Sequence, residues 1–286
     1  INFHQYIDTW QTNHGRGSAS LICARGCPFT CTWCSRSVFG DTHRRRSAKH
    51  VVDEIEMLLA EYKPDRLWFA DDVFTINHRW FYDFYEEMKK RNMKIPFECI
   101  SRADRLNEDI LQKMAELGSF RIWYGSESGS QRILDAMQRR VKVEQIQDIT
   151  QLAQKFGIEA GLFVMLGYPG EEISEIDATI THLKKTNPDT YLTTVAYPIK
   201  GTTLYNEVKD SLIINDDWET ITDRTLNFKG RHTEGFYWFA TRHMVNEVRF
   251  HKLMNNERKH VLPLVSSYAK SKVARMGMRL TEKART

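Results

Sequence analysis

The chain has 286 residues, of which 41% are hydrophobic and 27% charged, a composition that excludes intrinsically disordered and collagen-like proteins. Lys and Arg number 41 against 37 for Asp and Glu, and the resulting net charge of +4 is too small to indicate a nucleic-acid partner. No run approaches the roughly 18 apolar residues of a membrane span, and residues 1–17 lack the pattern of a signal peptide. We therefore expect a cytoplasmic protein with no membrane span.

Apolar patterns predict strands and helices that alternate along most of the chain. Ser47 is the expected N-cap of the first helix, because the apolar residues that follow it recur at helical spacing. The alternation of six strands with helices predicts right-handed βαβ units around a parallel sheet, and therefore an α/β fold. The expected strands cover residues 19–23, 67–70, 95–100, 120–124, 158–166 and 190–197, and the expected helices cover 51–62, 80–88, 110–117, 131–156 with a break near 139–142, and 173–183.

The pattern changes after the sixth strand. A long helix is expected over 236–262, interrupted by Pro263 and followed by a second helix over 264–278. The basic tail, residues 270–285, is expected to be solvated surface. Three parts are expected: a lead-in segment over 1–17, a core domain over 18–205 and a mostly helical extension over 206–286.

Polar or glycine-rich segments follow each of the six predicted strands. Because parallel strands present their carboxyl ends at one edge of a sheet, we expect these segments to form a single site at one rim. They are the cysteine loop, Asp71-Asp72, Ser101-Arg102, and residues 125–129, 167–171 and 198–202.

Four of the five cysteines fall within twelve residues, and three of these, Cys27, Cys31 and Cys34, form a compact triplet. An odd number of cysteines without a signal peptide argues against a disulfide framework. Structural zinc usually takes two separated pairs of ligands, whereas three soft thiolates on a cubane iron–sulfur cluster leave one iron open to another ligand. Cys23 and Cys99 lie in apolar segments and are expected to be core residues.

The cysteine spacing Cys-x3-Cys-x2-Cys, with Trp33 before the last cysteine, resembles that of the radical S-adenosylmethionine (SAM) superfamily. The resemblance extends over roughly residues 18–205. It implies an oxygen-sensitive enzyme whose fold is an open six-stranded (β/α)6 partial TIM barrel with a C-terminal helical extension. Segments similar to a subgroup with cobalamin-dependent enzymes and the anaerobic magnesium-protoporphyrin ester cyclase are 25–28, 69–74, 125–129 and 197–202.

The resemblance also implies the cofactors and the residues that bind them. Cys27, Cys31 and Cys34 would be the catalytic metal ligands of a [4Fe–4S] cluster, whose open iron binds the amine and carboxylate of SAM. An electron from a flavodoxin- or ferredoxin-type donor would cleave SAM to a 5′-deoxyadenosyl radical, which abstracts hydrogen from a small-molecule substrate. The residues expected to contact SAM are Trp33, Asp71, Asp72, Ser101, Arg102, Glu127, Ser128, Leu166, Pro169, Tyr197, Pro198 and Gly201.

Several of these residues also have a structural interpretation. Asp71 and Asp72 would accept hydrogen bonds from the methionine ammonium, or cap the next helix. Arg102 would pair with the methionine carboxylate or form a surface ion pair, and Trp33 would pack on adenine or inside its loop. Glu127 is the expected ligand of the ribose hydroxyls. The expected adenine slot consists of Leu166, Pro169, Pro198 and Gly201.

The basic segment 44–46 lies just beyond the cysteine loop. It would either steer an acidic electron donor towards the cluster or form an ordinary exposed loop.

Cobalamin-dependent relatives carry an Asp-x-His-x-x-Gly signature, which the chain lacks because Asp41-x-His43 is not followed by the glycine. Cobalamin is therefore expected only with a missing domain upstream of Ile1, which the absence of an initiator Met favours. The reaction would then be methyl transfer or cyclisation, between which the sequence does not distinguish. One alternative is a zinc-stabilised nucleic-acid-binding barrel without redox chemistry, with Cys23 or His43 as the fourth zinc ligand. Another is a radical SAM domain kept only as a scaffold.

Overall fold

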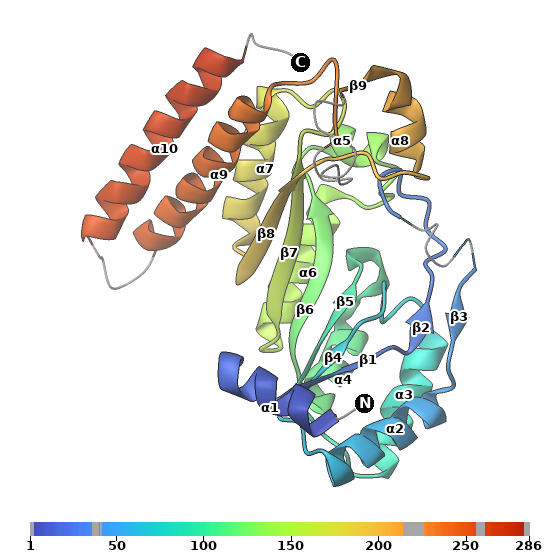
Figure 1. Cartoon of the computed structure of the whole chain (residues 1–286). Coiled ribbons are helices and arrows are strands. Elements are labelled where there is room, and N and C mark those ends of the chain that lie inside the picture. Colours follow the sequence, from blue (N-terminus) through green and yellow to red (C-terminus); the bar gives the residue numbers. More distant parts are fainter. Residues whose placement is uncertain (1–2, 36–39, 41, 214–225, 256–260, 283–286) are drawn as a thin grey trace. The chain divides into compact units, whose positions relative to one another are not determined.

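The computed structural model describes residues 3–35, 40, 42–213, 226–255 and 261–282 (Figure 1). Its strands are β1 (Ser18–Leu21), β2 (Ala24–Arg25), β3 (Arg44–Arg45), β4 (Arg66–Phe69), β5 (Phe97–Ser101), β6 (Ser119–Glu127), β7 (Glu159–Leu166), β8 (Thr190–Val195), β9 (Leu212–Ile213) and β10 (Asn227–Phe228). Its α-helices are α1 (Phe3–His14), α2 (Ala48–Glu61), α3 (His78–Lys90), α4 (Glu108–Leu117), α5 (Gln131–Ala136), α6 (Val143–Lys155), α7 (Ile173–Thr186), α8 (Thr203–Val208), α9 (Glu234–Met254) and α10 (Val261–Thr281).

Six strands form one parallel sheet in the order β1-β4-β5-β6-β7-β8, which is also their order along the chain. The pairs β1-β4, β4-β5 and β5-β6 have parallel register. At least one helix connects each strand to the next, as parallel neighbours require. The six strands are those that the sequence predicts, and the α/β fold class is confirmed.

Each of the six strands differs from its predicted range by one to three residues at one end or both, and two of these differences have a clear cause. β1 ends at Leu21, because the amides of Cys23 and Ala24 donate to the Asp71 carboxylate (2.6 and 3.0 Å) instead of continuing a ladder. β6 continues to Glu127, and the last four residues of this strand are buried although two of them are polar. An apolar pattern could not reveal that extension.

The chain divides into two compact units, each of which is described by itself. The domain boundaries predicted after residues 17 and 205 remain predictions. A helix, α1, occupies most of the expected lead-in segment. Among the described residues, none of the helices combines the length and apolar character needed to cross a membrane. Unit 1 comprises Ile1–Pro28, Val38–Gly125 and Asp148–Leu162, and unit 2 comprises Phe29–Ser37, Ser126–Gln147 and Phe163–Thr286.

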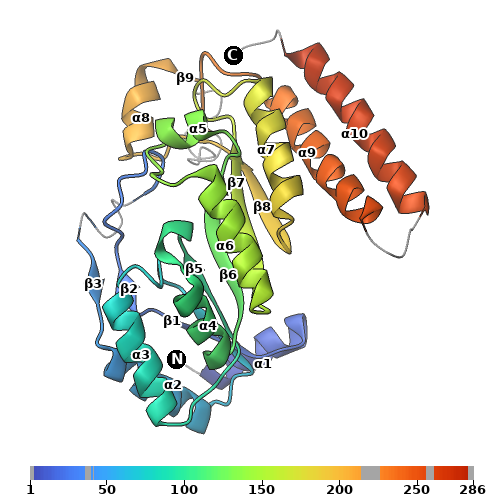
Figure 2. The ribbon, with the colours of Figure 1, turned by 180° about the vertical axis from the view of Figure 1, so that it is seen from behind.

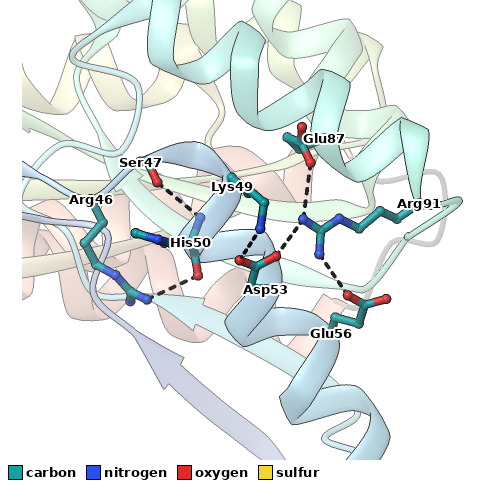
Figure 3. A network of polar contacts seen from close by, with 8 residues as sticks. All are labelled: Arg46, Ser47, Lys49, His50, Asp53, Glu56, Glu87 and Arg91. Atoms are coloured by element: carbon teal, nitrogen blue, oxygen red, sulfur yellow. Dashed lines mark hydrogen bonds and ion pairs between the residues drawn. The ribbon is translucent and has the colours of Figure 1, made fainter.

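In unit 1, an ion-pair network joins α2 to α3 (Figure 3). Arg91, at the end of α3, donates to Asp53 at 2.7 Å and to Glu56 at 2.8 Å, both on α2. It also donates to Glu87 on its own helix at 3.2 Å. Ser47 caps α2 as predicted, by accepting from the amide three residues on. Because several charges share the network, it stabilises the helix pair more than an isolated surface ion pair would.

In unit 2, α9 lies between α7 and α10 (Figures 1 and 2). The helix predicted over 236–262 ends at Met254, and α10 already begins at Val261. Pro263 therefore lies in the first turn of α10 and does not separate two helices. Its missing N–H costs nothing there, because the first amides of a helix have no intrahelical partner. The hydrophobic core of this unit contains Ile133, Met137, Met165, Tyr168, Ala196, Leu204, Val208 and Phe228.

Candidate functional site

The three cysteines of the triplet belong to both units. Cys27, in unit 1, is half-buried, whereas Cys31 and Cys34, in unit 2, are buried and exposed respectively. All five cysteines lie among the described residues, and none of them is in a disulfide bond. Within the described part of the chain, no group of three or more His, Cys, Asp or Glu side chains is placed to hold a metal ion. The ligand role of the triplet remains a prediction.

Thr32 anchors the segment between the second and third cysteines to the core of unit 2. Its amide donates to the carbonyl of Met137 at 3.1 Å, and its carbonyl accepts from the amide of Leu204 at 2.9 Å. Its hydroxyl forms a hydrogen bond with that of Tyr168 at 2.7 Å. Trp33 is partly buried and packs against the same core. The structure therefore gives Trp33 the loop-packing role, and its contact with adenine remains a prediction.

Arg139 lies beside Cys31 and is a candidate site residue that the sequence reasoning missed. Its Nη1 is 3.9 Å from the Sγ of Cys31, and its Nε is 3.7 Å from Oε1 of Glu127. The available signal was the helix break near this position. Gln138 and Arg140 both have positive φ (51° and 53°), and the arginine between them is buried. Hydrogen bonds to a ligating sulfur tune the properties of an iron–sulfur cluster, so this placement suits a supporting role.

Glu127 and Ser128 lie at the end of β6. Glu127 is buried with φ +55°, and its carboxylate faces Arg139. A non-glycine residue holds such a φ only where its surroundings fix it. The hydroxyl of Ser128 forms a hydrogen bond with that of Thr179 on α7 (3.2 Å) and accepts from the amide of Ser130 (3.1 Å). Ser128 thus stabilises the turn after β6, and the contacts of both residues with SAM remain predictions.

Asp71 and Asp72 follow β4 and lie in different environments. Asp71 is 1% exposed, accepts from the two amides that follow β1, and has its Oδ2 3.3 Å from Nη2 of Arg45. Burial raises the pKa of Asp71, and the neighbouring Arg45 and the two amides oppose that rise. Asp72 is exposed. The N-cap of α3 is Asn77, so the capping interpretation of the aspartates is wrong.

The basic segment 44–46 is not a uniformly exposed loop. The side chain of Arg45 is only 7% exposed, and its guanidinium lies 4.2 Å from the ring centroid of Trp80 and pairs with the buried carboxylate of Asp71. Arg46 is paired with Glu54 on α2, and Arg44 is exposed. The expectation that all three arginines face solvent is therefore wrong for Arg45, which is engaged inside unit 1.

Ser101 ends β5, and Arg102 follows it. The hydroxyl of Ser101 forms a hydrogen bond with that of Thr75. The Arg102 side chain is 3% exposed, and its Nε and Nη2 donate to both carboxylate oxygens of Asp104 at 2.8 and 3.2 Å. A bidentate pair of this kind is the strong arginine–carboxylate geometry. The expected surface ion pair is thus a buried one, and pairing with the methionine carboxylate remains a prediction.

The residues predicted to form the adenine slot follow β7 and β8 in unit 2. The ends of these strands adjoin, because the amide of Ala196 donates to the carbonyl of Leu166 at 2.7 Å. Contact of this region with adenine remains a prediction. Leu166 and Pro198 are buried, Pro169 and Tyr197 are half-buried, and Gly201 is exposed with φ +89°.

Glu171 is a buried acid in the loop after β7. It is 4% exposed, and its Oε2 accepts from the amide of Gly167 at 2.5 Å. Burial raises the pKa of Glu171 to about 8, so the carboxyl group is largely protonated at neutral pH. Gly167 has φ +76°, and a Cβ there would lie 2.9 Å from the Tyr237 ring. Glu171 therefore stabilises the loop after β7 at Gly167, a position whose backbone conformation requires glycine.

The two candidates for a fourth zinc ligand have other roles. Cys23 is fully buried, and burial raises the pKa of its thiol well above the ordinary value, so it is a neutral core residue as expected. Cys99 is buried in the same way. The Nδ1 of His43 forms a hydrogen bond with the carbonyl of Gly26 at 2.9 Å, and its Nε2 accepts from Nε of Arg45 at 3.5 Å. Nothing in these contacts favours a zinc site.

Comparison with known proteins decides the family. The sequence model of the Radical SAM superfamily matches residues 21–183, which is more than half of the chain. The chain belongs to the radical SAM superfamily. The expected membership of this superfamily is therefore confirmed, and the cofactors of the family are a [4Fe–4S] cluster and SAM.

Two curated proteins are similar to this chain in sequence. The chain is 33% identical over 214 residues to an uncharacterized methyltransferase of Pyrococcus horikoshii, which covers 74% of this chain and 47% of the relative. It is 29% identical over 195 residues to the anaerobic magnesium-protoporphyrin IX monomethyl ester cyclase of Rubrivivax gelatinosus, covering 68% of this chain and 35% of the cyclase. The chain thus spans about half or less of the length of these relatives.

The radical SAM fold also matches a solved structure. The methyltransferase TsrM from Kitasatospora setae, with tryptophan and a SAM analog bound, has a TM-score of 0.71 at 14% identity, covering 98% of this chain and 63% of TsrM. TsrM with cobalamin and a [4Fe–4S] cluster bound has a TM-score of 0.63 at 17% identity, covering 68% and 37%. At this identity the likeness concerns the fold alone, and it confirms a TIM-barrel-like radical SAM domain.

Proposed function

We propose that this radical SAM protein holds a [4Fe–4S] cluster through Cys27, Cys31 and Cys34 and cleaves SAM reductively for hydrogen abstraction. The observation that carries the proposal is the Cys-x3-Cys-x2-Cys spacing of Cys27, Cys31 and Cys34, which lies inside the region that matches the family. Three soft donors in one short loop fit an iron–sulfur cluster. When bound, the cluster and SAM supply the one-electron cleavage of a carbon–sulfur bond, which yields a 5′-deoxyadenosyl radical.

The protein's own residues would position and tune this chemistry. Thr32, which is hydrogen-bonded to Met137, Tyr168 and Leu204 of unit 2, would fix the backbone between the second and third proposed ligands. Arg139 would donate an N–H···S hydrogen bond to the second ligand, Cys31, and place a positive charge beside the negative cluster. Glu171 accepts a hydrogen bond from the amide of Gly167 and would thereby fix the loop after β7, which carries Pro169 of the predicted adenine slot. Each role uses a contact within unit 2.

The proposed reaction requires an external one-electron donor, and a flavodoxin- or ferredoxin-type protein has the suitable chemistry. A reducing cytoplasm would keep the five thiols free and the cluster intact. The substrate would be a small molecule that enters beside SAM.

We further propose methyl transfer or cyclisation as the reaction class. The printed names of the relatives support this, since they include a methyltransferase and a cyclase. Cobalamin would take part only if a domain outside these 286 residues supplies it.

Anaerobic reconstitution with iron and sulfide tests the proposal. The expected protein is brown, contains iron and acid-labile sulfide, and forms 5′-deoxyadenosine from SAM when a strong reductant is added. Cys31→Ala should lose cluster and product, while Cys99→Ala, which removes a buried thiol outside the loop, should keep both. A colourless protein with one bound zinc, or a Cys31→Ala variant with unchanged product formation, would refute the proposal. S-adenosylhomocysteine among the products would indicate methyl donation.

A further inference from the structure

The C-terminal helix α10 packs against α9 through an inner face of mostly small residues. Gly277 contacts the ring of Phe239 on α9 so closely that a Cβ would lie 2.5 Å from it. The hydroxyl of Ser271 donates to Glu247 on α9 at 2.6 Å and accepts from Nδ1 of His243, also on α9, at 3.0 Å. This face therefore permits close approach of the two helices. Its buried residues are Ser267, Ser271, Ala274, Gly277 and Met278.

The opposite face of α10 carries the larger apolar side chains. The exposed fractions are 84% for Leu262, 58% for Val265, 67% for Val273, 63% for Met276 and 78% for Leu280. With about 100° of rotation per residue, these five side chains fall within a sector of roughly 80°, on the side away from the buried residues. We call them the outer stripe. Single exposed apolar residues need no explanation, but a continuous stripe along a whole helix marks an interaction surface.

Positive charges flank the outer stripe on both sides. At the same rotation per residue, Lys270 lies on one side of it, and Lys272 and Arg279 lie on the other. All three residues are exposed. Residues 261–281 contain no Asp or Glu. The exposed half of α10 is thus a basic amphipathic surface.

The helix that carries the outer stripe is firmly attached to unit 2. Arg275, on the flank of the inner face, donates to both carboxylate oxygens of Asp177 on α7, at 2.6 and 2.7 Å. Lys184 on α7 pairs with Glu247 on α9 at 2.6 Å. These ion pairs join α9 and α10 to α7, so that α10 is held to the rest of the unit (Figures 1 and 2).

We propose that α10 docks this protein on an anionic lipid bilayer, with the helix axis in the membrane plane and the outer stripe in the acyl boundary. Apolar side chains between cations are the pattern of interfacial helices, which gain affinity from buried apolar area and from attraction to anionic headgroups. A second copy of the helix is disfavoured as the occupant, because it would bring like charges together along both flanks. Nucleic acid is disfavoured because the centre of the surface is aliphatic.

Vesicle co-sedimentation of the 286-residue chain tests the proposal without requiring catalysis. We expect binding to phosphatidylcholine vesicles that contain phosphatidylglycerol, and binding weaker by about tenfold or more to phosphatidylcholine alone. The double variant Val273→Glu, Met276→Glu should lose binding, and Lys270→Glu, Lys272→Glu should lose the preference for the anionic lipid. Met57→Glu, at a partly exposed position on α2 in unit 1, is the matched control and should bind normally.

Four outcomes would overturn the proposal. One is the absence of binding to anionic vesicles, and another is unchanged binding by the stripe variant. The third is a stable dimer in sedimentation velocity that the stripe variant dissociates, which would assign the surface to a second copy. Binding of an RNA probe in place of vesicles, lost in the lysine variant, would assign it to nucleic acid. Circular dichroism of each variant checks that α10 is still folded.

Discussion

Replacing Glu171 with glutamine should abolish a large pH dependence of stability. In the folded protein burial keeps this carboxyl group protonated up to about pH 8, whereas in the unfolded chain it releases its proton near the ordinary value of 4.5. Between these values the folded state binds one more proton than the unfolded state, so stability is greatest below the lower value and falls as the pH rises. The difference between the two pKa values corresponds to a loss of about 5 kcal/mol in the free energy of unfolding as the pH rises from the lower to the higher value.

Glu171→Gln keeps an oxygen that accepts from the amide of Gly167, but its amide cannot ionise. We expect the variant and the parent protein to be about equally stable at the acidic end of the interval. At the alkaline end the variant should be more stable, by up to about 5 kcal/mol. Urea denaturation followed by circular dichroism, under reducing conditions and across this pH range, measures the difference.

Glu175→Gln is the matched control, four residues away on α7. The pKa of Glu175 is lowered, because hydrogen bonds from Arg132, the Glu172 amide and Ser174 outweigh its burial. Ionised Glu175 therefore stabilises the folded state above its ordinary pKa, and this stabilisation is lost on acidification. At the alkaline end of the interval Glu175→Gln should thus be less stable than the parent protein, whereas Glu171→Gln should be more stable. Parallel pH profiles of the parent protein and Glu171→Gln would refute the assignment of a protonated, buried Glu171.

Three further substitutions test other contacts. Asp71→Asn leaves a buried guanidinium without its counter-charge and should cost about 3 kcal/mol in urea denaturation, whereas the exposed Asp72→Asn should change stability by less than about 0.5 kcal/mol. Arg139→Gln removes the N–H···S contact with Cys31 and should slow formation of 5′-deoxyadenosine about tenfold with iron content unchanged, and an unaltered rate would contradict its positioning role. Gly129→Ala places a Cβ 2.5 Å from a backbone oxygen of α7 and should lower the free energy of unfolding by about 1–3 kcal/mol, and an unchanged thermal midpoint would contradict this close packing.

Local patterns sufficed for the sheet and for most helices. The six strands are short apolar runs between polar segments, and the helices carry apolar residues at helical spacing, so both follow from burial on one side of each element. Ser47 could be predicted as an N-cap because its hydroxyl acts on an amide only three residues away. Membership of the radical SAM superfamily was equally accessible, because its cysteine spacing is confined to one loop.

Contacts between distant parts of the chain could not be predicted in this way. Arg45 and Asp71 are 26 positions apart and meet because β3, which carries Arg45, pairs with β2 directly after β1, while Asp71 follows β4, the neighbour of β1 in the sheet. Arg139 is buried because two residues of positive φ redirect the chain on either side of it, a conformation that propensities do not indicate. A proline indicates a helix boundary but does not show whether it lies before the helix or in its first turn. For this reason the sequence pattern puts the start of α10 after Pro263, whereas the helix begins before it.

The anchoring of Thr32 has a consequence for biosynthesis. Its partners, the carbonyl of Met137 and the amide of Leu204, are made more than a hundred and more than a hundred and seventy residues later by the ribosome. The cysteine loop of the nascent chain therefore cannot acquire its final backbone until almost three-quarters of these 286 residues have emerged. If the loop holds the proposed cluster, iron and sulfide would therefore meet its final backbone conformation only after Leu204 has been synthesised.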